Sequence, residues 1–273
     1  MAASNLTLRL LSAAVVVPPL LFLMFRGPAW GFFLLVLLAA ALAVRELLRL
    51  THRGDTFGQG VGIAMTLASA AATYAFPRDP RVLWAVLLLV PIVGMLLPLA
   101  RLGEIGTAAL RMTASATAPL YVGVSLATLA LLRRDFTDGP GWVVLALTFA
   151  WLADTGGYFF GRFLGRTKLY PAVSPKKTRA GFVGALLGAV LGAVVARFWF
   201  LPGLDLARGV PLALVAGASG QAGDLAESLL KRSTGVKDSG SLVPGHGGML
   251  DRVDALLVVA PLVYLFALFT QSN

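Results

Sequence analysis

Two pairs of acidic residues, each spaced three apart, stand out in a chain that carries few charges. They are Asp224 and Glu227 in GDLAES, and Asp251 and Asp254 in LDRVD. Residues three apart share one face of a helix, so each pair presents two carboxylates together. Mg²⁺ prefers oxygen ligands and usually takes one or two protein carboxylates, with substrate phosphates completing its shell. The pairs favour a divalent-metal site, although Asp251 could instead cap the last helix.

A further carboxylate, Asp154 in FAWLADTGGYFF, lies about halfway along an apolar run. A charge at that depth in a membrane must face a cavity or a partner. The sequence therefore leaves two interpretations of Asp154, a cavity-facing ligand or a buried ion pair with an arginine on another helix.

Basic residues gather in two segments close to these carboxylates. The first, GRFLGRTKLYPAVSPKKTRAG, is expected to be a loop, and its SPKKT stretch sets the hydroxyls of Ser174 and Thr178 beside Lys176 and Lys177. Ammonium and hydroxyl groups together suit a polyphosphate. The alternative is an anchor that touches anionic lipid headgroups.

The second basic segment contains the glycine-rich turn PGHGG, residues 244–248. Glycines let backbone amides approach an anion closely, although a plain turn with a structural histidine is the simpler interpretation. Phosphate binding gains support from the cations around the turn, which are Lys231, Arg232, Lys237 and Arg252.

Carboxylates, cations and a glycine-rich turn together indicate metal-assisted phosphoryl or nucleotidyl transfer. Such chemistry needs positioning and charge neutralisation more than a protein nucleophile. The chain has no cysteine, which excludes disulfides, thiolate metal sites and a cysteine nucleophile. Neither a nucleophile elbow nor an HExxH motif is present.

The elements that must position these residues are membrane helices. The chain is 58% hydrophobic and only 13% charged, with a mean hydropathy of +0.81. Because a span takes about 20 apolar residues, we expect an all-α integral membrane protein with about nine transmembrane helices. The expected spans are residues 10–25, 29–44, 57–76, 82–100, 114–132, 141–161, 181–200, 209–229 and 253–270.

Charge in the connecting segments predicts the orientation. With the N-terminus inside, most of the basic residues fall on the cytoplasmic side, including both segments described above. The site is therefore expected to face the cytoplasm. The same bias accounts for the net charge of +10, and no basic tail or aromatic-interleaved patch favours nucleic acid.

No linker separates domains, so residues 1–140 and 141–273 are expected to form N-terminal helices and a C-terminal catalytic region of one continuous membrane domain. The glycines at 184, 188 and 192 have the spacing that lets helices approach closely. We expect helix packing there, or a homodimer contact.

The motifs together resemble a known family. The stretch S-x-x-K-R-x4-K-D-S-G-x3-P-G-H-G-G-x-x-D-R-x-D, residues 228–254, resembles the signature of the phosphatidate cytidylyltransferase (CDP-diacylglycerol synthase) family. Its other blocks are similar to DTGGYF, GR, SPKKT and GDLxES in this chain, in the same order. The resemblance covers roughly residues 150–254. It departs at Arg179-Ala180, where the family usually has an aromatic or aliphatic residue and then Glu or Gln.

The resemblance implies transfer of CMP from CTP to phosphatidate, with CDP-diacylglycerol and pyrophosphate as products. It implies Mg²⁺, alone or with a second cation, and a bacterial inner membrane. A phosphate monoester has a second pKa of about 6, so the lipid phosphate can attack without a general base. Cations must then draw two anionic reactants together.

The resemblance also suggests residue roles. We expect Asp224 and Asp251 to hold Mg²⁺, with Asp154 and Asp254 as further ligands. The expected catalytic residues are Asp224, Asp251, Lys231 and Arg232. The expected substrate-binding residues are Ser174, Lys176, Lys177, Thr178, Lys237, His246, Gly247, Gly248 and Arg252.

Two other functions fit part of the pattern. A transferase acting on a polyprenyl phosphate and a nucleotide sugar would use the same metal and phosphates but release UMP. A secondary transporter would use Asp154, Asp224 and Glu227 to carry ions at mid-membrane, and leaves the PGHGG turn unexplained.

Overall fold

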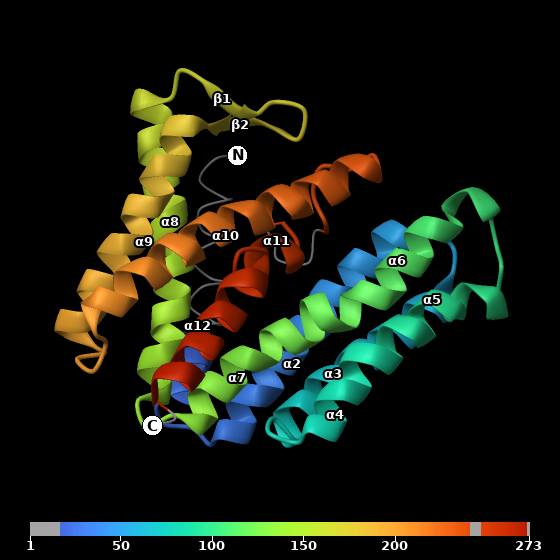
Figure 1. Ribbon diagram of the computed structural model, residues 1–273. Coiled ribbons are helices and arrows are strands. Elements are labelled where there is room, and N and C mark those ends of the chain that lie inside the picture. Colours follow the sequence, from blue (N-terminus) through green and yellow to red (C-terminus); the bar gives the residue numbers. More distant parts are fainter. Residues whose placement is uncertain (1–16, 241–246, 272–273) are drawn as a thin grey trace. The chain divides into compact units, whose positions relative to one another are not determined.

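The computed structural model describes residues 17–240 and 247–271, and these form two compact units (Figure 1). The first unit takes residues 1–131 together with 238–253, and the second takes 132–237 together with 254–273. The chain therefore enters each unit twice. The division expected between residues 140 and 141 separates N-terminal helices from a catalytic region, whereas these two units are defined by packing. The expected division stays a prediction.

The first unit is built on α2 (Ala29–Thr51), which packs against α3, α6 and α11. Two stretches in this unit, η1 and η3, are π-helical turns set inside longer helices. The other elements are α3 (Thr56–Ala75), α4 (Pro80–Trp84), η1 (Ala85–Leu89), α5 (Val90–Ala100), η2 (Ile105–Thr107), α6 (Ala108–Ala118), η3 (Pro119–Val124), α7 (Ser125–Asp135), which runs into the second unit, and α11 (Leu250–Val253).

The second unit centres on α8 (Gly139–Leu164), which packs against α9 (Arg179–Trp199), α10 (Leu206–Ser233) and α12 (Leu256–Gln271). Figure 1 shows α8 and α9 lying side by side, with the strands β1 (Lys168–Tyr170) and β2 (Ser174–Thr178) beyond their ends. Because α8 and α9 are joined through this hairpin, the basic segment sits where the two helices meet.

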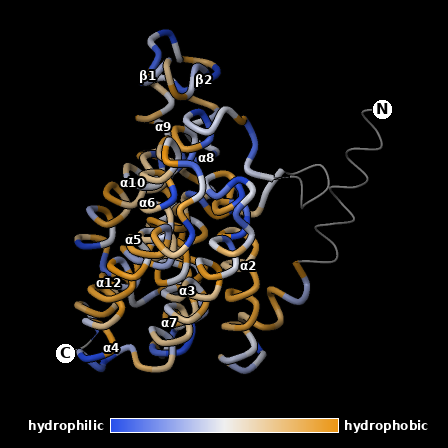
Figure 2. The backbone as a smooth tube through the Cα atoms, turned by 90° about the vertical axis from the view of Figure 1, so that its right-hand side faces the viewer, coloured by the Kyte–Doolittle hydropathy of each residue, from blue (hydrophilic) through white to orange (hydrophobic). Residues whose placement is uncertain are grey.

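Six helices in the described part of the chain are long and apolar enough to cross a membrane, as an all-α membrane protein requires. Each predicted span with described residues falls on a helix, but α3 and α10 are not among the six. Both are rich in small or polar residues, and α10 carries five charged side chains. The count of nine stays a prediction. Figure 2 shows hydrophobic residues along most helices and hydrophilic ones around the hairpin.

The SPKKT stretch is a strand, so the expectation of a loop was wrong there, although the described part of the fold is otherwise helical. β1 and β2 pair antiparallel, with Lys168 opposite Thr178 and Tyr170 opposite Ser174. Thr178 ends the strand, and its Oγ1 accepts a hydrogen bond from the Gly181 amide (3.1 Å), which caps α9. This cap needs no side chain at Arg179 or Ala180, where the family pattern is broken.

Glycines allow α8 and α9 to pack at very short range. A Cβ at Gly184 would lie 2.5 Å from both the Gly156 carbonyl oxygen and the Phe160 Cβ, and one at Gly188 would lie 2.7 Å from the Leu152 carbonyl carbon. The glycine run is thus used for packing inside the chain, as one of its two interpretations predicts. The homodimer stays a prediction.

A buried polar cluster joins α2 to α6 in the first unit. His52 Nδ1 lies 2.9 Å from Thr51 Oγ1, and its Nε2 lies 3.0 Å from Ser115 Oγ. Burial lowers the pKa of His52 below 6.5; the charge of Asp55 opposes this shift and that of Arg111 adds to it. The ring is therefore neutral at neutral pH.

Replacing Gly188 by Val should destabilise the second unit by about 1–3 kcal/mol, because the added carbons meet the backbone of α8. The measurement is the thermal unfolding midpoint in detergent. Gly203→Val is the matched control, because nothing lies within 4 Å of its Cβ position. Equal midpoints for the two variants would contradict the close packing.

The His52 cluster predicts a loss of stability in mild acid. The unfolded state binds the proton near pH 6.5 and the folded state only at lower pH, so stability falls as pH drops below 6.5. One such proton contributes at most about 1.4 kcal/mol per pH unit. Unfolding midpoints between pH 7.5 and 5.5 should fall more steeply in the wild type than in His52→Asn, and parallel curves would refute the assignment.

Candidate active site

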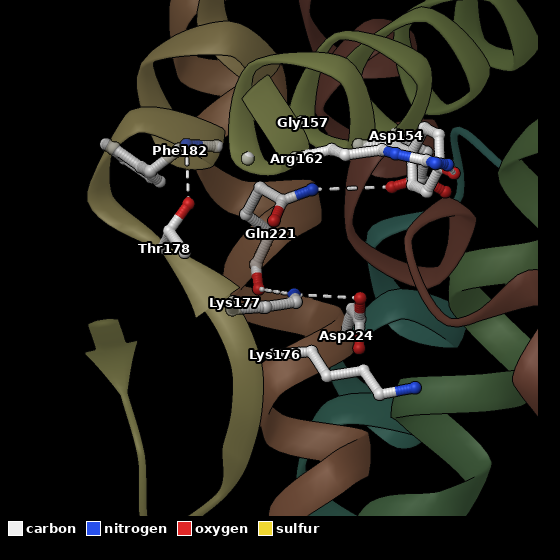
Figure 3. Close-up of a pocket in the computed structure, with 12 residues that line it drawn as sticks. Asp154, Gly157, Arg162, Lys176, Lys177, Thr178, Phe182, Gln221 and Asp224 are labelled. Carbon is white, nitrogen blue, oxygen red and sulfur yellow. Dashed lines mark hydrogen bonds and ion pairs between the residues drawn. The ribbon is translucent and has the colours of Figure 1, made fainter. Parts of the chain in front are cut away.

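A polar cavity of about 390 Å³ opens in the second unit among α8, β2, α9 and α10 (Figure 3). This volume lies within the range of small-molecule sites. Its wall combines carboxylates, cations and backbone exposed at glycines. The lining residues are Asp154, Gly157, Tyr158, Gly161, Arg162, Lys176, Lys177, Thr178, Gly181, Phe182, Gln221 and Asp224.

The centre of the cavity wall is an ion pair between β2 and α10. Lys177 Nζ lies 2.8 Å from Asp224 Oδ2 and donates a second hydrogen bond to the Gln221 carbonyl oxygen (3.3 Å). Figure 3 shows the Lys177 amino group between these two oxygens, with Lys176 beside it. Lys177 and Asp224 are almost 50 residues apart in the sequence, and the structure brings them into contact. Both had been assigned to one site from the sequence.

Asp154 lines the same cavity, on α8. Its Oδ1 accepts a hydrogen bond from Gln221 Nε2 (3.3 Å), drawn in Figure 3. Asp154 thus lines the cavity, and its role as a ligand stays a prediction. Gln221 is itself 7% exposed, so one buried amide orients Asp154 while its backbone carbonyl orients Lys177.

Arg162 adds a further cation to the wall. Its Nη1 donates to the Tyr158 hydroxyl (2.5 Å), and the guanidinium lies 5.9 Å from the centre of that ring. The two residues are one helical turn apart on α8, which holds them on one face. Arg162 and Tyr158 are exposed, so both are accessible to a ligand in the cavity.

The carboxylates of the second unit are oxygen ligands of the kind that a divalent cation prefers. Asp254 interacts electrostatically with both Asp224 and Asp154, so it lies near the carboxylates of the cavity. Among the described residues, no three His, Asp or Glu side chains are close enough to hold an ion by themselves. Mg²⁺ commonly binds through one or two carboxylates plus substrate phosphates, and that donor set is what the cavity offers.

Asp251 lies in the first unit and is held by its own loop. Its Oδ2 accepts hydrogen bonds from Ser239 N (3.2 Å), Ser239 Oγ (3.0 Å) and Gly248 N (3.0 Å). Gly247 has a φ of +82°, a conformation that other residues rarely adopt. An anion does approach the glycine amides here, and it is the carboxylate of Asp251. The substrate-binding roles of Gly247 and Gly248 stay predictions.

The other predicted site residues lie outside the cavity wall. Lys231 pairs with the buried Glu227 (2.8 Å), and Arg232 Nη1 donates to the Val236 carbonyl oxygen (3.3 Å). Lys237 and Arg252 are exposed. Ser174 begins β2, and His246 falls outside the described residues. The roles predicted for all of them stay predictions, as does the sharing of one ion by Asp224 and Asp251.

Several residues of these clusters were missed from the sequence. Gln221 lies three residues before Asp224 on α10. This spacing puts the two side chains on the same face of the helix, so Gln221 could have been predicted. Tyr158 precedes Arg162 by four residues. Glu46, which contacts Ser239, is the one acidic residue of α2, a helix that is mostly apolar apart from Arg45 and Arg49, and this was a usable signal. Ser239 carried no signal beyond its place in the family motif.

Comparison with known proteins agrees with this chemistry. A family model described as "Cytidylyltransferase family" matches residues 7–270. A protein named phosphatidate cytidylyltransferase from Brucella suis is 47% identical over 156 residues, 56% of this chain and 57% of that protein. One of the same name from Staphylococcus haemolyticus is 41% identical over 143 residues, 52% of this chain and 54% of that protein.

The matches thus cover somewhat more than half the length of these relatives. The family model, by contrast, takes in nearly every residue of the chain, both the N-terminal helices and the motifs that line the cavity. The chain belongs to the cytidylyltransferase family.

Proposed function

We propose that the protein transfers CMP from CTP to phosphatidate and forms CDP-diacylglycerol and pyrophosphate. The observation that carries the proposal is the cavity in which Lys176, Lys177 and Arg162 share a wall with Asp154 and Asp224. Relatives that carry the name phosphatidate cytidylyltransferase support the choice of substrates. The helices suited to a membrane support a lipid as one of them.

The bond changes need no protein nucleophile. An oxygen of the phosphatidate phosphate attacks the α-phosphorus of CTP, the new P–O bond forms, and the bond to the β-phosphate breaks. Pyrophosphate leaves with the electron pair. Because a phosphate monoester is mostly dianionic at neutral pH, the attacking oxygen needs no base to remove a proton.

The difficulty is repulsion between two anions, and the residues of the cavity address it. Lys177 is fixed by Asp224 and by the Gln221 carbonyl, so its charge is oriented before substrate arrives. Such preorganised charge stabilises a transition state without further reorganisation. Lys176 and Arg162 offer additional positive charge along the wall.

Mg²⁺, when bound, would offset negative charge on the triphosphate and leaving group. Asp224 and Asp154 are the residues of the cavity that would hold it, and Asp254 is close enough to contribute to their field. Asp251 remains the further ligand that the family motif suggests. We also propose the bacterial inner membrane as the location and the cytoplasmic side as the face of the site, since CTP is available there.

The first test is an assay of the purified protein with phosphatidate and each of the four nucleoside triphosphates. Pyrophosphate and CDP-diacylglycerol should appear with CTP and Mg²⁺, and EDTA should abolish both. Release of UMP from a nucleotide sugar and a polyprenyl phosphate would point instead to the other transferase. Ion flux across sealed vesicles without nucleotide would point to a transporter.

Replacing Lys177 by Met should lower kcat about a hundredfold or more, the usual effect of losing one charged contact in a transition state. Lys168→Met is the matched control, because Lys168 is an exposed lysine of β1 outside the cavity wall. Steady-state kinetics of the two variants provide the measurement. Similar kcat values in both would remove Lys177 from the site.

A further inference from the structure

Glu46 is a buried carboxylate for which the proposed chemistry has no role. It lies near the C-terminal end of α2, where it is the one acidic residue among mostly apolar neighbours. Only 6% of its surface is exposed. A carboxylate buried in this way is stable only when donors satisfy both of its oxygens.

Those donors come from one short segment about 200 residues later in the chain and in the same unit. Glu46 Oε1 accepts from the Met249 amide (2.9 Å), and Oε2 accepts from the Leu250 amide (2.9 Å) and Ser239 Oγ (2.9 Å). Three hydrogen bonds to one charged group are among the stronger contacts a protein makes. Glu46 thus ties both ends of the 239–250 segment to α2.

The fit around this carboxylate is tight. A Cβ at Gly240 would lie 2.7 Å from Glu46 Oε1, and one at Gly248 would lie 2.8 Å from Glu46 Cδ. A larger residue at either position would push the Glu46 carboxylate away from its donors. Gly240 and Gly248 of the family motif therefore leave space for Glu46, a residue of α2 in the N-terminal part of the chain.

Ser239 links Glu46 to Asp251. Its Oγ lies 2.9 Å from Glu46 Oε2 and 3.0 Å from Asp251 Oδ2. A hydroxyl carries one hydrogen, so the two carboxylates compete for it or share it. The same Asp251 oxygen also accepts from the Gly248 amide, next to the two amides that bind Glu46. Any displacement of Glu46 must therefore move the groups that hold Asp251.

We propose that Glu46 is a positioning residue that fixes the orientation of the Asp251 carboxylate through Ser239 and the 248–250 backbone. The inference rests on the proposed function, in which Asp251 binds metal or substrate. A purely structural Glu46 would stabilise the fold without affecting turnover of the folded protein. Groups that orient metal ligands in this way usually change affinity or activity about 10- to 100-fold when they are altered.

The test compares Glu46→Gln with Glu104→Gln, the same change at an exposed position of the same unit. Glutamine keeps the shape of Glu46 but turns one acceptor into a donor that faces other donors. We expect kcat of Glu46→Gln to fall about 10- to 100-fold, with KM for phosphatidate unchanged. Glu104→Gln should match the wild type.

Two further readouts do not depend on turnover. Hydrogen exchange resolved to single amides should speed up in Glu46→Gln at Ser239 and Gly248, which bind Asp251 and not Glu46 through their amides. Binding of Mn²⁺ alone, followed by its electron paramagnetic resonance signal, should weaken in the same variant. Asp251→Asn provides the reference for full loss of the Asp251 contribution.

Ser239→Ala tests the same link from the other side and covers the case in which Glu46→Gln fails to fold. It should also lower kcat and weaken Mn²⁺ binding. The inference is overturned if the folded variants keep wild-type kcat and Mn²⁺ binding, whatever happens to their stability. If the wild type itself has no activity with CTP and phosphatidate, the proposed function fails, and the exchange at Ser239 and Gly248 still decides whether Glu46 controls Asp251.

Discussion

A charged group that is largely removed from water must find a partner, and this requirement shapes both the cavity wall and the Glu46 cluster. Removing a charge from water costs several kcal/mol unless it is paired or hydrogen-bonded. Lys177 meets the requirement with Asp224 and a backbone carbonyl, and Glu46 meets it with two amides and a hydroxyl. In each case the partner comes from a distant part of the chain, so satisfying the charge also fixes the tertiary structure.

The same constraint orients charged groups along the cavity wall. The ammonium group of a lysine that a carboxylate already holds in place can interact with a phosphate with little loss of conformational freedom. Gln221 serves both members of the wall, since its amide orients Asp154 and its carbonyl orients Lys177. Under the proposed function both substrates are anions, and a cation held by these carboxylates would couple metal binding to substrate binding.

Local patterns in the sequence predicted the helices and much of the cavity. Apolar runs of span length fall on helices, and motif spacing placed Asp154, Lys176, Lys177, Thr178 and Asp224 in one site. The hairpin was missed, because proline and lysine disfavour strands and SPKKT becomes one through its pairing with β1. Glu46 and Ser239 were missed for a similar reason. Glu46 and Ser239 contact each other but are 193 residues apart in the sequence, and hydrophobic periodicity does not reveal a contact over such a separation.

The long separation between Glu46 and its donors has a consequence for how the protein is made. α2 is synthesised early, whereas Met249 and Leu250 leave the ribosome only when the chain is nearly finished. During that interval the Glu46 carboxylate lacks the Met249 and Leu250 amides that it binds in the folded protein, and an unsatisfied charge among apolar helices is costly. The turn that holds Asp251 can therefore gain its contacts with α2 only after the C-terminal motif has been synthesised.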